Sequence, residues 1–161
     1  MPFDASAEPS IPLGAQRLLA LADVLDALPT NDYNQKEFGM KTDCGTVACA
    51  MGWGGLKIPE VLGYRTKFSP IDTFLISSTA GPARIDFARA EMLDLNGGSL
   101  NMFAAAEEIF DISPALAWEL FGTTGDAYKN GEYATPQEVA AKLREVAAKK
   151  IALAKEQIHA L

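Results

Sequence analysis

Both cysteines of the chain lie in one short stretch, residues 43–55, whose sequence is DCGTVACAMGWGG. A cysteine at the N-terminus of a helix has its thiolate stabilised by the helix dipole. If a helix begins after Asp43, Cys44 becomes a candidate nucleophile. A pocket built around Cys44, Thr46 and Trp53, with Asp43 as the adjacent carboxylate, would then form the binding site.

A thiol nucleophile needs a group that accepts its proton, and this requirement weakens the hypothesis. The chain has one histidine, His159, the third residue from its end, where a general base is difficult to hold in place. Free cysteine is also among the most buried residue types. The favoured interpretation is therefore that Cys44 and Cys49 are small buried side chains and that the chain has no catalytic residue. A disulfide between them is not expected, because residues five apart on a helix point in different directions.

Metal and cofactor motifs are not recognised. Structural zinc sites take four Cys or His ligands, and this chain has three such residues. The stretches that begin at Asp94 and Asp126 lack the ligand pattern of a calcium-binding EF-hand, so both are predicted to be turns. We predict no metal and no cofactor, although a carboxylate-rich metal site stays open.

Composition limits the class of partner and the compartment. The 161 residues are 48% hydrophobic and 22% charged, which is typical of one globular domain. The net charge of -7 repels phosphate backbones and anionic lipid, so neither nucleic acid nor a membrane is expected as partner. The first residues lack the features of a secretory signal, and two cysteines without such a signal indicate reduced thiols and the cytoplasm.

Hydrophobic periodicity predicts helices at both ends of the chain. Leucines three and four residues apart over 18–28 predict the first helix, and Pro29 ends it. Ser113, Pro114 and Gly122 are the start and stop signals of a short helix, which a second helix from Ser99 precedes. A Thr-Pro-Gln-Glu capping box from Thr135 begins a long final helix.

The middle of the chain has no sustained helical period. Residues 56–81 mix prolines, β-branched residues and aromatics, which favours loops, with a short hairpin or 3₁₀ turns as the alternatives, and a short helix is predicted over 84–93. The predicted fold is mainly α: one compact domain of five or six helices, residues 14–161, around an irregular central loop region, preceded by a flexible N-terminal arm, residues 1–13.

The segment CGTVACAMGW, residues 44–53, resembles a CGTxxCxxGW signature of small uncharacterised bacterial and phage-borne proteins. In that family a leucine-rich helix comes first, and helices similar to AWELFG and TPQEVAAKL follow the signature. The resemblance spans residues 18–146 and implies a shared structural core. It implies no activity.

Two functions are compatible with these observations. The first is a non-enzymatic protein-interaction module, whose long amphipathic last helix presents a face to a partner or to a second copy. The alternative is a small thiol-based enzyme or ligand-binding protein with its pocket around Cys44 and Trp53. The missing catalytic base favours the first function.

Overall fold

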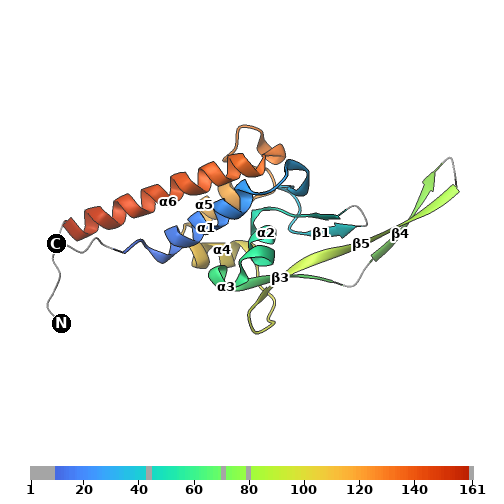
Figure 1. Ribbon diagram of the computed structural model, residues 1–161, viewed down its shortest axis with the longest axis horizontal. Helices are drawn as coiled ribbons and strands as arrows, with labels where there is room; N and C mark the ends of the chain where they lie inside the picture. Colours follow the sequence, from blue (N-terminus) through green and yellow to red (C-terminus); the bar gives the residue numbers. More distant parts are fainter. Residues whose placement is uncertain (1–9, 43–44, 70–71, 79–80, 160–161) are drawn as a thin grey trace.

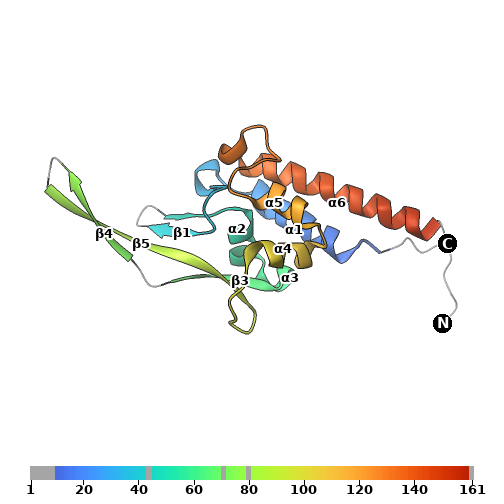
Figure 2. The same ribbon diagram turned by 180° about the vertical axis from the view of Figure 1, so that it is seen from behind.

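The computed structural model describes residues 10–42, 45–69, 72–78 and 81–159. It has a body of helices from which a long β-ribbon extends to one side (Figures 1 and 2). In chain order the elements are α1 Leu13–Asp26, η1 Thr30–Asp32, β1 Met40–Thr42, β2 Gly45–Val47, α2 Ala50–Lys57, α3 Pro59–Leu62, β3 Tyr64–Phe68, β4 Asp72–Ser78, β5 Gly81–Asp94, α4 Met102–Phe110, α5 Pro114–Phe121, η2 Gly131–Tyr133 and α6 Pro136–His159.

The five strands form one antiparallel sheet around β5. The half of β5 nearest the body pairs with β3, from Ala90 to Asp94, and the outer half pairs with β4, from Gly81 to Phe87. β1 pairs with the opposite edge of β5 at residues 87–89, and β2 pairs with β1. We call β4 together with residues 81–87 of β5 the β-arm.

The prediction of a mainly α fold is wrong. Six α-helices are found among the described residues, but the five-stranded sheet makes the protein a mixed α/β fold. The predicted helix over 84–93 is part of β5, and the predicted loop region 56–81 contains α3, β3 and β4.

Strand pairing explains why β5 was predicted to be a helix. Its alanine, arginine, glutamate and methionine residues favour helices in isolation. In the fold Ala88 and Met92 are buried while Arg89 and Glu91 are exposed, which is the alternation of a strand with one face on the core. β3 pairs with one edge of this part of β5 and β1 pairs with residues 87–89 at the other edge, so tertiary pairing overrides the local preference.

The predicted helices at the two ends of the chain are confirmed. α1 buries Leu18, Leu21 and Leu25 against α6, whose Val139 and Leu143 are also buried. Helix starts follow the predicted caps as well. The Ser113 hydroxyl accepts a hydrogen bond from Leu116 N–H at 3.1 Å, and the Thr135 hydroxyl accepts one from Glu138 N–H at 3.2 Å. The Glu138 carboxylate, however, accepts from the Asn130 amide.

The glycines of α2 bring the sheet against the helical body. A Cβ atom on Gly55 would overlap Thr66 Oγ1, and one on Gly54 would lie 2.8 Å from the Tyr64 hydroxyl oxygen. Because these positions have no side chain, β3 lies directly on the helix. On another side of the helix, a Cβ atom on Gly52 would overlap the backbone carbonyl of Phe38. The Tyr64 hydroxyl donates to Met51 C=O and the Thr66 hydroxyl donates to Gly52 C=O at 2.8 Å.

Replacing Gly52 by alanine is therefore expected to destabilise the protein, although the same change stabilises most helices. In an open helix the change stabilises by about 1 kcal/mol. Here the new methyl group meets the Phe38 backbone, and we expect a loss of about 1–3 kcal/mol in the free energy of unfolding, measured by urea titration. The control is Ala148→Gly on the exposed face of α6, which should cost about 1 kcal/mol through helix propensity alone. A Gly52→Ala protein more stable than wild type would contradict this packing.

Candidate functional site

The structure separates the predicted site residues. Asp43 and Cys44 lie outside the described residues. Thr46 is half-buried in β2, opposite Lys41 of β1, and Trp53 is buried in α2. Thr46 is not among the residues that line the pocket beside Trp53. Thr46 and Trp53 thus lie on different elements, and the pocket beside the end of α1 that Trp53 lines does not include Thr46.

The helix of this segment begins later than predicted. α2 starts at Ala50, and residues 45–47 form a strand. Gly45 has a φ of 124°, a conformation that residues with a side chain rarely adopt and that helices do not use. The residue before the first turn of α2 is therefore Cys49, so the helix dipole acts on Cys49 instead of Cys44.

Cys49 is nevertheless a poor nucleophile. It is a free thiol that is 4% exposed. Burial raises its pKa to about 11, although backbone N–H groups of Gly52 and Met51 in the first turn of α2 lower it. Desolvation is the larger of the opposing effects, so the thiol is protonated at neutral pH.

We expect Cys49 to react with iodoacetamide only after the protein unfolds. At pH 8 the buried thiol is almost wholly protonated and shielded from the reagent. Peptide mapping by mass spectrometry measures the labelling of each cysteine, and a Cys44→Ser variant isolates the reaction of Cys49. Labelling of native Cys49 at the rate of a free thiol would contradict the buried environment.

Burial of the same thiol also predicts a loss of stability at alkaline pH. Below pH 9 the thiol is protonated in both the folded and unfolded chains, and above that value the unfolded chain loses the proton first. Stability should thus fall between pH 9 and about 11 by at most about 1.4 kcal/mol per pH unit from this group. Burial raises the pKa of Tyr33 and Tyr64 too, and they add to the loss at higher pH.

The measurement is urea unfolding at a series of pH values for wild type and Cys49→Ala. The variant should be less stable overall because it leaves a small cavity, but its stability should fall less steeply between pH 9 and 10. Parallel pH profiles for the two proteins would mean that Cys49 does not contribute.

Trp53 lines a shallow pocket of about 380 Å³ beside the end of α1. Its indole N–H donates to Asp32 C=O at 2.8 Å, and the Lys57 ammonium lies 5.6 Å from the ring centroid. The wall is completed by Val24, Ala27, Leu28 and Pro29. The pocket could accept a small apolar group, and its lining includes no cysteine, serine or histidine.

Trp118 is 44% exposed on α5, and its ring packs against Phe103 in a tilted arrangement, with ring centroids 5.1 Å apart. The stretch from Asp94 is a turn, as predicted: the Asp94 carboxylate accepts from the N–H groups of Asn96 and Gly98 at 2.7 and 3.0 Å. Over the described residues, no three His, Cys, Asp or Glu side chains are grouped to hold a metal ion.

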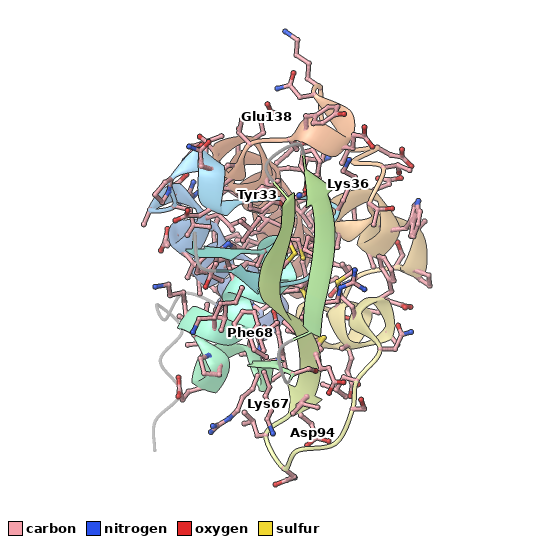
Figure 3. All side chains as sticks on the ribbon, turned by 90° about the vertical axis from the view of Figure 1, so that its right-hand side faces the viewer. Tyr33, Lys36, Lys67, Phe68, Asp94 and Glu138 are labelled. Atoms are coloured by element: carbon pink, nitrogen blue, oxygen red, sulfur yellow. The ribbon has the colours of Figure 1, made fainter. Side chains whose placement is uncertain are left out.

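The β-arm is the feature that sequence analysis missed. It continues past the end of β1 and projects from the body. Figure 3 looks at its outer end, so β4 and β5 lie nearest the viewer. β5 is the described element with which β4 makes its extensive contacts. The short run of large apolar residues in TFLIS, residues 73–77, was a weak signal for this strand.

Comparisons of the chain with protein-family models, with curated proteins and with solved structures find no match. The resemblance based on residues 44–53 therefore stays a prediction. None of the described helices is long and apolar enough to cross a membrane.

Proposed function

We propose that this chain is a non-enzymatic protein-interaction module and that the β-arm is its binding element. The observation that carries the proposal is the position of the arm: β4 pairs with β5 well outside the helical body, with no helix packed on either of its faces among the described elements (Figures 1 and 2). A two-stranded ribbon alone in water is marginally stable at best. A partner that covers the arm would supply the burial that the body does not.

The distribution of apolar residues along β5 supports this role. Within the body, the even-numbered positions Ala88 and Met92 are buried. Beyond the body the apolar types move to odd-numbered positions, Ile85 and Phe87. Because alternate residues of a strand belong to opposite faces, the apolar face of the arm continues the side of β5 that faces away from the core.

The register of β4 brings further apolar positions to the same face. Phe74 pairs with Ile85, and Ile76 pairs with Ala83, and directly paired residues belong to one face of a sheet. A partner that buries one large apolar side chain fully gains about 1.5–3 kcal/mol. Several such positions in one short ribbon are enough for a specific contact of moderate affinity.

Charge supports a protein as the partner. The net charge of -7 disfavours nucleic acid and anionic membranes, and the cytoplasm is the compartment we propose. The alternative, a thiol-based enzyme, receives no support from Cys49, whose thiol is protonated at neutral pH.

The test shortens the β-arm and leaves the body intact. Residues 73–86 are replaced by Asn-Gly, a favoured two-residue hairpin turn, between Asp72 and Phe87, which already pair in the sheet. Wild-type protein identifies partners by cross-linking in a lysate of its source organism, and the purified partner is then titrated. We expect the shortened protein to bind at least about tenfold more weakly, a loss of about 1.4 kcal/mol.

Substitutions within the β-arm test the contact in the same titration without removing any part of the chain. Phe74→Ser with Ile85→Ser makes one paired position on the apolar face polar and should weaken binding. Arg84→Ser, at the position next to Ile85 and therefore on the opposite face, is the control and should bind like wild type. Undiminished affinity of the shortened protein would refute the proposal.

A further inference from the structure

The two long edges of the β-arm differ in protection against pairing with another strand. Exposed edges in natural sheets usually carry charges, prolines or bulges that discourage added strands. The outer edge of β5 carries residues of this protective kind at three positions, Pro82, Arg84 and Asp86. The five residues of β4 from Thr73 to Ser77 contain no charge, no proline and no glycine.

Backbone direction shows which residues of β4 are available at its outer edge. In an antiparallel strand, successive residues direct their N–H and C=O groups to opposite neighbours. Arg89 C=O accepts from Ser69 N–H on the β3 side, whereas Ala90 N–H donates to Gly39 C=O on the β1 side, at 2.8 Å. Odd-numbered residues of β5 thus bond to β4, and the residues paired with them are 72, 74, 76 and 78.

The remaining residues of β4, Thr73, Leu75 and Ser77, direct their backbone groups to the outer edge. No described strand pairs with this edge. Three N–H and three C=O groups are therefore available in a row, with Leu75 at the centre. On the opposite edge Pro82 has no N–H, and β1 already pairs with β5 at residues 87–89.

The sequence of this edge is complementary to itself in the reverse direction. Read from either end, TFLIS runs hydroxyl, large apolar, leucine, large apolar, hydroxyl. If two copies align antiparallel about Leu75, each Thr73 meets Ser77 of the second copy and each Phe74 meets Ile76 of the second copy. Cross-strand pairs of these types stabilise sheets, and no like charges oppose one another.

We propose that the partner at this edge is a second copy of the chain, paired through β4 with a two-fold axis at Leu75. The inference rests on the proposed function, because it uses the β-arm as the binding element. The two arms form a four-stranded antiparallel sheet, and such a sheet is more stable than a two-stranded ribbon. Both faces of the sheet stay open, so the apolar face of each arm remains available to another protein.

Charge does not oppose this dimer. Each chain carries a net charge of -7, which would resist close approach of two bodies. In the antiparallel arrangement the bodies lie at opposite ends of the paired strands, which are seven residues long. That length corresponds to roughly 24 Å, well beyond the screening length of about 8 Å at physiological salt.

Two double variants test the pairing and its register by sedimentation velocity over the micromolar range. Thr73→Lys with Ser77→Lys places lysine opposite lysine at both ends of the pair, and Thr73→Lys with Ser77→Glu places lysine opposite glutamate. We expect wild type to dimerise, the first variant to associate at least about tenfold more weakly, and the second to associate like wild type. Both variants place Lys opposite Asp86 within the arm, so that contact is matched.

A pair of proline variants tests the edge without new charge. Leu75→Pro removes an outward N–H of β4 and should abolish the dimer. Arg84→Pro removes the matching outward N–H of β5 and should leave the dimer intact. Circular dichroism and thermal unfolding establish that both proteins stay folded.

A monomeric wild type would overturn the inference, and so would equal association of the two lysine-containing variants. Loss of the dimer in Arg84→Pro together with its retention in Leu75→Pro would place the contact on the wrong edge. The proposed function is tested separately. If the wild type is monomeric but needs the β-arm to bind its partner, the proposed function is supported and the self-association is refuted. If the wild type dimerises but the shortened protein binds the partner with full affinity, the self-association is supported and the proposed function is refuted.

Discussion

The close approach of β3 to the glycine helix α2 holds the sheet on the helical body. Tyr64 and Thr66 of β3 each donate a hydroxyl hydrogen bond to a backbone carbonyl of α2. These contacts require that Gly54 and Gly55 have no side chain. Buried hydroxyl groups that lose their acceptor cost about 1–3 kcal/mol each, so the interface tolerates little separation. The base of the β-arm is fixed in this way, because β5 pairs with β3.

The same segment explains why Cys49, although it lies beside a helix N-terminus, is a protonated thiol at neutral pH. The first turn of α2 offers backbone N–H groups to Cys49, and in a solvated setting they would favour the thiolate. The helix, however, is pressed into the core, where desolvation outweighs the N–H groups and raises the pKa. The packing that anchors the sheet is thus the cause of the unreactive thiol.

Stability and exposure are divided between two parts of the molecule. The body buries the leucine residues of α1 against α6. Its loops are held by buried hydrogen bonds, in which the Gln35 side-chain amide donates to the carbonyls of Leu120 and Gly122. In the β-arm, by contrast, β5 is the described element with which β4 makes its extensive contacts. A rigid body with a projecting strand pair is an arrangement that suits binding through strand edges and faces, in which backbone groups give affinity and side chains give selectivity.

The sequence by itself determined the elements whose signals are local. The leucine spacing of α1, the Ser113 and Thr135 caps and the turn at Asp94 depend on residues within one or two turns of each other, and these predictions are confirmed. The start of α2 was placed too early because Gly45, which interrupts any helix from Asp43, was taken as a glycine within the helix.

Only the tertiary structure decided the sheet and the β-arm. Between the pairs Phe68–Ala90 and Asp72–Phe87 the pairing register shifts by one residue, and the apolar face of β5 changes sides near the same point. A sequence pattern with period two breaks at such a shift, so no strand of 14 residues could be recognised from it. Pairing with β1, β3 and β4 makes β5 a strand despite its helix-forming residues, because backbone hydrogen bonds to distant segments outweigh local propensity.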